Sequence, residues 1–195
     1  MKKGSEPIMT AKAAAGQMMF LKDFIESPAK IGSITPSSPY LTRRLLASLP
    51  WEKSRVIVEL GAGTGVFTEF IENHRRRDSV FLVIEQDSRM QAALKERFPQ
   101  VLFGSNAEDL PYLMRLHDLP QADCIVSGLP FAVIKKKTRL KILAGIDRSL
   151  ARHGTFAAFQ YSLQMYCTFH RIFRKVKLGF TPLNLPPAFT YTCCR

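Results

Sequence analysis

Three glycines at alternate positions, Gly61, Gly63 and Gly65, follow the apolar run Arg55–Leu60 and precede a segment with helical spacing. Glycines at a strand-to-helix junction let backbone N–H groups approach a ligand closely, and a helix N-terminus favours negative charge. A dinucleotide fingerprint would need a glycine three residues after Gly63, where this chain has Val66. No Lys-Ser or Lys-Thr pair follows, so the loop is not a Walker phosphate loop either.

Polar or glycine-containing segments follow three further apolar runs in the same way. Glu85 ends the run Val80–Glu85, where a carboxylate can accept hydrogen bonds from both hydroxyls of a ribose. Gly104–Leu110 follows the third run, and the corner Ser127–Phe131 follows the fourth. Open α/β sheets bind ligands at the carboxyl ends of their strands. The four segments therefore predict one binding site at one edge of a sheet.

The apolar periodicity predicts the elements that must position these residues. Short β-branched runs alternate with amphipathic stretches, which indicates an α/β protein with a doubly wound sheet and right-handed crossovers. Ser88 is the expected N-cap of the helix Ser88–Phe98. The expected strands are Arg55–Leu60, Val80–Glu85, Val101–Phe103, Ala122–Ser127, Gly154–Gln160 and Pro187–Cys194; the expected helices are Met9–Glu26, Tyr40–Leu49, Ser88–Phe98, Val66–His74 and Lys135–Leu150, with a basic amphipathic stretch over Leu163–Lys177.

The E-x-G-x-G-x-G form of residues 59–65 resembles motif I of the class I S-adenosylmethionine-dependent methyltransferases. Residues 104–110 resemble the motif G-x-D-A-x-D-L of these enzymes, with Asn106 at the acidic position that bonds the adenine amine; its amide oxygen can still accept. The resemblance implies a Rossmann-like fold with S-adenosylmethionine as cofactor and S-adenosylhomocysteine as product. It implies cofactor contacts from Glu59, Gly61, Ala62, Gly63, Thr64, Gly65, Glu85, Gln86, Asn106, Ala107, Ser127, Gly128 and Ser38.

Residues 20–45, motif I, the corner Ser127–Phe131 and the ending Leu183–Phe189 together resemble the bacterial phospholipid N-methyltransferases. This family methylates the amine of phosphatidylethanolamine, up to three times, towards phosphatidylcholine. The resemblance implies an N-terminal helical extension over residues 1–50, with an amphipathic membrane helix carrying Phe20 and Phe24 and a loop that covers the cofactor. It implies a methyltransferase domain over residues 51–195.

The acceptor amine must be neutral to act as nucleophile, and its free pKa should lie near that of an alkyl amine, about 10. Backbone carbonyls at Ser127–Leu129 and a phenol could hold it, while solvent takes the proton. Tyr161 matches a tyrosine near this point in the phospholipid family and is the preferred phenol; Tyr40 is the other candidate. Leu129, Pro130 and Phe131 are expected to contact the substrate or the membrane.

The charge is concentrated at the two ends of the chain. The net charge is +12, of which residues 129–195 contribute +11, residues 1–44 contribute +4 and the middle segment −3. Such a field favours a polyanion or an anionic membrane surface. Lys135, Lys136 and Lys137 follow the acceptor corner directly, which favours contact with lipid phosphates.

The 46% apolar and 23% charged composition excludes wholesale disorder, and no apolar run is long enough to span a bilayer. The histidines and cysteines show no metal-ligand spacing. We therefore expect a monomeric, cytoplasmic, metal-free enzyme that associates peripherally with the inner face of the plasma membrane and acts on a phospholipid there.

An rRNA adenine N6-methyltransferase is the alternative, because the rRNA adenine dimethylases share the Leu-Pro-aromatic corner. Those enzymes carry Asn where this chain has Ser127, and they have a further helical domain for which the 35 residues after Gln160 leave no room. Methylation of a small soluble amine would leave the basic ends without a role. A non-enzymatic module is disfavoured by the intact set of Glu59, Glu85 and the loop glycines.

Overall fold

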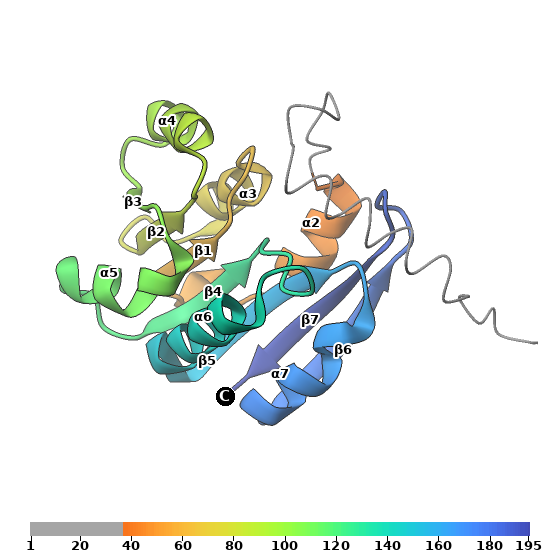
Figure 1. The fold of residues 1–195 in the computed structure, drawn as a ribbon. Helices are drawn as coiled ribbons and strands as arrows, with labels where there is room; N and C mark the ends of the chain where they lie inside the picture. Colours follow the sequence, from red (N-terminus) through yellow and green to blue (C-terminus); the bar gives the residue numbers. More distant parts are fainter. Residues whose placement is uncertain (1–36) are drawn as a thin grey trace, which may run out of the picture. The chain divides into compact units, whose positions relative to one another are not determined.

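The computed structural model describes residues 37–195, whose helices pack on a seven-stranded sheet (Figure 1). The strand order is β3-β2-β1-β4-β5-β7-β6; β7 runs antiparallel to β5 and β6, and the other neighbours pair in parallel. The strands are β1 (Val56–Leu60), β2 (Val80–Ile84), β3 (Leu102–Gly104), β4 (Ala122–Ser127), β5 (Leu150–Gln160), β6 (Lys175–Thr181) and β7 (Ala188–Cys194). This topology confirms the predicted doubly wound α/β fold.

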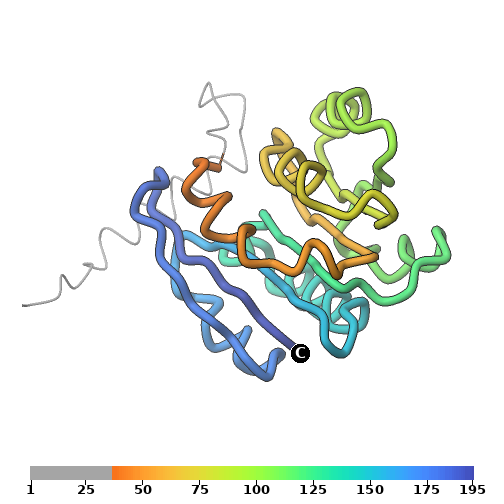
Figure 2. Tube along the Cα trace, turned by 180° about the vertical axis from the view of Figure 1, so that it is seen from behind, coloured from red at the N-terminus to blue at the C-terminus, as the bar shows by residue number. Residues whose placement is uncertain are grey.

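Helices cover both faces of the sheet, as the two opposite views show (Figure 2). Leucines and aromatic residues of α2, α3 and α4 form one buried cluster with one face, and those of α5, α6 and α7 form a second cluster with the other. The helices are α2 (Pro39–Leu46), α3 (Val66–His74), α4 (Ser88–Arg97), α5 (Leu110–Leu116), α6 (Lys136–Ser149) and α7 (Tyr166–Ile172), with single 3-10 turns η2 (Trp51–Lys53), η3 (Ala107–Asp109) and η4 (Leu163–Met165).

Burial on both faces explains why the central strands are almost continuously apolar. All five residues of β1 are buried, and the only polar one among them is Glu59. The flanking helices use one apolar stripe each, which leaves their outer faces charged.

Helix α2 belongs to the sheet domain, although the sequence placed it in an N-terminal extension ending at residue 50. Leu41, Leu45 and Leu46 are fully buried, and Ser38 caps the helix by accepting a hydrogen bond from the Leu41 amide at 3.2 Å. The predicted amphipathic helix over Met9–Glu26, with Phe20 and Phe24, lies outside the described residues.

Three local predictions differ from the structure. Asp87, rather than Ser88, is the N-cap of α4, because its carboxylate accepts from the Arg89 and Met90 amides at 2.9 and 3.1 Å. The basic stretch Leu163–Lys177 divides into η4, α7 and the start of β6. Helix α5 was not predicted. Within residues 37–195, no helix has both the length and the hydropathy needed to cross a membrane.

Candidate functional site

The carboxyl ends of four strands bring predicted site segments to one edge of the sheet. Leu60 at the end of β1 pairs with Ile84 of β2 and with Ser127 of β4, and Ser127 pairs in turn with Ala158 of β5. The glycine loop, Glu85, the corner after β4 and Tyr161 all follow directly from these paired ends. Residues far apart in the sequence therefore meet in one place.

The glycine loop lies directly against the corner after β4. A Cβ atom on Gly128 would stand 2.6 Å from the carbonyl oxygen of Gly61, and one on Gly61 would stand 2.8 Å from the Leu129 side chain. Gly61 also has a φ of +75°, a conformation that L-residues with side chains rarely adopt. Gly63 differs, because a Cβ there would meet nothing within 4 Å. The loop is thus packed on its inner side and open at Gly63.

Glu85 is positioned by the loop it faces. One carboxylate oxygen accepts from the Gly63 amide at 2.7 Å and the other from the Asp87 amide at 2.9 Å. Each oxygen keeps a further lone pair, so the carboxylate can still accept ligand hydroxyls. Gln91 of α4 holds the surrounding strand ends together, since its side-chain amide donates to the carbonyls of Glu85 and Gly104 at 3.1 and 2.9 Å.

Glu59, in β1, lies two residues before Gly61 and hydrogen-bonds to α3. Its side chain is completely buried; one oxygen accepts from the Thr68 hydroxyl at 2.8 Å, and the other has no hydrogen-bond partner among the described residues. Burial raises its pKa from 4.5 to about 8; the Thr68 hydrogen bond acts in the opposite direction, and the nearby Glu85 raises it further. Glu59 is therefore mainly protonated at neutral pH and carries no charge into the site.

Two of the residues predicted to bind cofactor, Gly63 and Thr64, line a cavity of about 450 Å³. Gly63, Thr64, Asp87 and Arg97 are among the residues that line this cavity, which opens between the glycine loop and α4. Arg97 fixes the loop by donating to the Thr64 carbonyl at 2.9 Å. Two predicted residues are exposed after the neighbouring strands, Gln86 after β2 and Asn106 after β3, where the Asn106 side-chain oxygen accepts from the Glu108 amide at 3.0 Å.

Two side-chain hydrogen bonds to the backbone of Leu129 stabilise the corner after β4. Ser127 is buried, and its hydroxyl accepts from the Leu129 amide at 3.2 Å, so the hydroxyl is engaged inside the turn. Gln160, at the end of β5, donates from its side-chain amide to the Leu129 carbonyl at 2.9 Å and is 2% exposed. Sequence reasoning missed Gln160; a lone amide at the end of an apolar strand was the available signal.

The prediction that Phe131 contacts substrate or membrane is wrong. Its side chain is fully buried and packs edge to face against Phe156 and Phe169, with ring centroids 6.5 and 6.1 Å apart. Leu129 and Pro130 remain partly exposed at the corner, and Lys135, Lys136 and Lys137 are exposed where α6 begins. Leu129 and Pro130 are therefore accessible to a ligand, whereas Phe131 is not.

Tyr161 occupies the same edge beyond β5. Its ring packs against Phe159 with centroids 5.5 Å apart, and burial raises the pKa of its phenol, partly offset by the side chain of Asn184. Asn184 also accepts from the Ser38 amide at 3.0 Å, so it connects Tyr161 with the residue that caps α2. Sequence reasoning did not single out Asn184. Tyr40, the other candidate phenol, is 62% exposed on α2.

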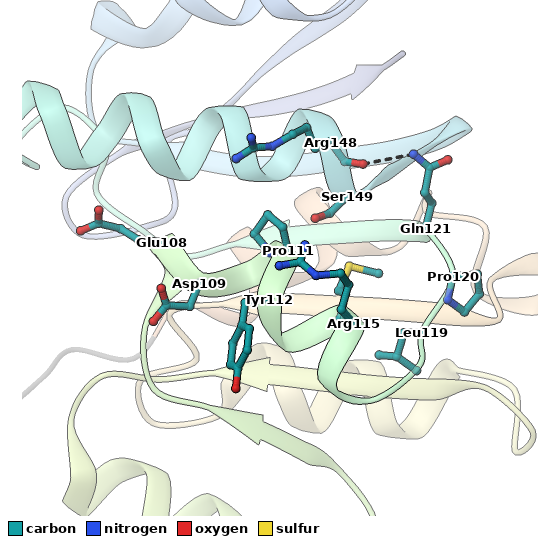
Figure 3. A pocket seen from close by; sticks show the side chains of 11 residues that line it. Glu108, Asp109, Pro111, Tyr112, Arg115, Leu119, Pro120, Gln121, Arg148 and Ser149 are labelled. Carbon is teal, nitrogen blue, oxygen red and sulfur yellow. Dashed lines mark hydrogen bonds between the residues drawn. The ribbon is translucent and has the colours of Figure 1, made fainter.

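A second cavity, of about 460 Å³, lies between α5 and α6 (Figure 3). It lies next to the amino end of β4, where Gln121 donates to the Arg148 carbonyl at 3.1 Å, and Tyr112 and Arg115 extend along it from α5. The glycine loop, Glu85 and the corner after β4 contribute nothing to its lining. The residues with predicted chemistry are therefore elsewhere. Across residues 37–195, no group of three or more His, Cys, Asp or Glu side chains is arranged to hold a metal ion.

Comparison with known proteins gives one close relative and many structural neighbours. No protein-family model matches the chain. The chain is 36% identical over 181 residues to an ornithine lipid N-methyltransferase from Singulisphaera acidiphila, a match that covers 90% of this chain and 94% of that protein.

Solved structures of methyltransferases share the fold. The 1,6-didemethyltoxoflavin-N1-methyltransferase of Burkholderia thailandensis, which was crystallised with S-adenosylhomocysteine, has a TM-score of 0.63 at 13% identity, covering 98% of this chain and 93% of that one. An rRNA methylase from Streptococcus thermophilus has a TM-score of 0.58 at 15% identity, covering 80% and 94%. At such low identity these matches establish the fold and nothing finer.

Proposed function

Since the chain belongs to the lipid N-methyltransferases, enzymes that use S-adenosylmethionine, we propose that it methylates the alkyl amine of a membrane lipid. The observation that carries the proposal is the 36% identity to an ornithine lipid N-methyltransferase, because it extends over 90% of the chain. A lipid with an ornithine headgroup is therefore the first candidate acceptor. Phosphatidylethanolamine, to which the sequence motifs pointed, is the second. In both cases the enzyme would act as a monomer at an anionic membrane surface.

The residues at the carboxyl edge fit the cofactor. Gly63 leaves open space beside the loop, Glu85 retains lone pairs for ribose hydroxyls, and Asn106 stands after β3 where the adenine is expected. S-adenosylmethionine supplies a methyl group activated by its sulfonium. Glu59 is fully buried, so Glu85, which bonds to the Gly63 amide, is the carboxylate that we assign to the ligand.

The chain's contribution to the reaction is to hold an uncharged amine in place. Burial raises the pKa of the Tyr161 phenol, which favours its protonated form, so we assign it the role of orienting the amine by hydrogen bonding. Gln160 holds the Leu129 carbonyl, which fixes the corner that the amine must approach. Positioning of two bound reactants can supply much of the rate enhancement of such a displacement.

The alternative acceptor, adenine in rRNA, gains no support beyond the shared fold. The rRNA methylase that resembles this chain does so at 15% identity. The match to a lipid N-methyltransferase is 36% identical over 90% of the chain, well above the identity to this rRNA methylase.

The proposal is tested by incubating the full chain with methyl-labelled S-adenosylmethionine and four separate acceptors: vesicles with ornithine lipid, vesicles with phosphatidylethanolamine, vesicles of phosphatidylcholine alone, and bare rRNA. Label is expected in the lipid fraction of one or both amine-containing vesicles. Glu85→Gln should lower cofactor affinity and labelling, whereas Glu96→Gln, an exposed carboxylate on α4, should leave both unchanged. Label in rRNA alone would overturn the proposal.

A further inference from the structure

Large apolar side chains are exposed mainly in one segment near the C-terminus. Ten such side chains are exposed among the described residues, and six of them fall within residues 163–185. The two most exposed of all are Leu185 at 82% and Leu183 at 63%, both in the turn between β6 and β7. We call the six the hairpin patch: Leu163, Tyr166, Leu178, Phe180, Leu183 and Leu185.

The hairpin patch adjoins the candidate site. Phe189 at the start of β7 pairs with Gln160 at the end of β5. The β6–β7 turn, which directly precedes β7, therefore lies at the same edge of the sheet as the candidate site. Both views show this turn beside the start of α2, beyond the end of β5 (Figure 1). Phe180 contacts Phe189 across the two strands, with ring centroids 5.0 Å apart. Among the strands of residues 37–195, β6 is the last of the sheet and pairs only with β7.

A buried asparagine holds the turn that presents the two leucines. Asn184, between them in sequence, is 6% exposed; its side chain donates to the Pro186 carbonyl at 2.7 Å and accepts from the Ser38 amide. The polar residue of this turn is thus inside and the apolar residues are outside, the reverse of an ordinary surface turn. Exposed apolar groups grouped in this way mark an interaction surface.

The charge around the hairpin patch indicates what covers it. No Asp or Glu occurs after Asp147, whereas residues 148–195 contain seven Lys and Arg. Arg171, Arg174, Lys175 and Lys177 are exposed on α7 and β6 or between them. An exposed apolar segment whose charged side chains are all cationic matches the surface of an anionic bilayer, which is negatively charged outside and apolar beneath.

We propose that the hairpin patch docks onto an anionic membrane, with Leu183 and Leu185 entering the interfacial layer and the basic residues contacting lipid phosphates. The inference rests on the proposed function, since it explains how a lipid amine comes to the site: Asn184, which holds the turn, also adjoins Tyr161. Docking by this turn would place the membrane next to the edge where the cofactor and the acceptor corner lie.

The test measures partition of the full chain onto sedimented vesicles of phosphatidylglycerol and phosphatidylcholine that contain no amine lipid. Leu183→Ser with Leu185→Ser should lower the partition coefficient by at least about tenfold. The matched control is Leu116→Ser with Leu140→Ser, two leucines exposed at 57% and 52% on α5 and α6, and it should bind as the wild type does. Melting temperature and cofactor affinity of both double variants verify folding.

A second pair of variants tests the charges without touching the turn. Lys175→Gln with Lys177→Gln should weaken binding at low salt by about fivefold for each charge removed, while Arg115→Gln with Arg152→Gln should not. Raising the salt concentration should reduce the difference between the two pairs.

The proposal is overturned if the folded leucine variant sediments with vesicles as the wild type does. It is equally overturned if these leucines maintain a dimer, or if residues 1–36 shield them, so that their substitution changes sedimentation of the free chain or protease sensitivity but not vesicle binding. Vesicle binding and methylation are separate readouts: loss of docking with detergent-dispersed lipid still methylated leaves the proposed function intact. Vesicle binding by a chain that methylates no lipid would contradict the proposed function and leave the docking proposal intact.

Discussion

Glu59→Gln should flatten a pH dependence of folding stability that the buried Glu59 imposes. The native environment of this carboxyl raises its pKa from 4.5 to about 8, chiefly because burial disfavours the charged form. The folded protein therefore keeps the proton over a pH range in which the unfolded chain has lost it. Stability from this group is complete below about pH 4.5 and decreases as the pH rises towards 8.

The size of the effect follows from the two pKa values. At about 1.4 kcal/mol per pH unit, the interval from 4.5 to about 8 corresponds to a total loss of about 5 kcal/mol. About 2 kcal/mol of this is already lost at pH 6, so about 3 kcal/mol remains to be lost between pH 6 and pH 9. For a domain of this size, that should lower the melting temperature by about 6–12 °C. Glutamine has no such proton and imposes no such loss.

The assay is thermal unfolding of both proteins at pH 6, 7, 8 and 9, by calorimetry with matched buffers. The stability of Glu59→Gln relative to the wild type should increase by about 3 kcal/mol between pH 6 and pH 9, because only the wild type loses stability over this range. Glu52→Gln, which removes an exposed carboxylate on η2, should follow the wild type. Parallel curves for the wild type and Glu59→Gln would refute the reasoning, since Glu59 would then be ionised in the folded state.

Three substitutions at the acceptor corner should separate positioning from stability. Gly128→Ala places a Cβ 2.6 Å from a backbone oxygen and should cost about 1–3 kcal/mol of stability and most of the activity, whereas Gly145→Ala, in α6 with its nearest contact at 3.4 Å, should be neutral or stabilising by up to about 1 kcal/mol. Gln160→Ala removes the hydrogen bond to the Leu129 carbonyl and should lower kcat about tenfold while cofactor affinity, measured by calorimetry, changes less than about twofold. Tyr161→Phe keeps the ring and should lower kcat/KM for the lipid without changing melting temperature or the pH profile below pH 9; an added pH dependence would assign the phenol a proton-transfer role.

Much of the sheet could be predicted because its signals are local. The run Ala122–Ser127 matches β4, and the stretch from Val66 to His74 matches α3, because strand apolarity and helical spacing are both read within a few residues. The meeting of the glycine loop with Glu85 also follows from topology, since parallel strands share one carboxyl edge.

The parts that could not be predicted depend on contacts between distant residues. Gln160 reaches Leu129, 31 positions away, and Asn184 reaches Ser38, 146 positions away, and no sequence pattern encodes either pair. Phe131 was misassigned for the same reason: its burial depends on aromatic rings of β5 and α7 that pack around it. The basic stretch ending at Lys177 has one charge pattern throughout, although it changes from helix to edge strand within a few residues.

The measurement that tests the central claim most directly is mass spectrometry of lipids recovered after incubation of the full chain with unlabelled S-adenosylmethionine. The account predicts that ornithine lipid, phosphatidylethanolamine or both gain the mass of one or more methyl substitutions on the headgroup amine. It also predicts that the gain disappears with Gly128→Ala and persists with Gly145→Ala. An unchanged lipid spectrum from a protein shown to bind the cofactor would contradict it.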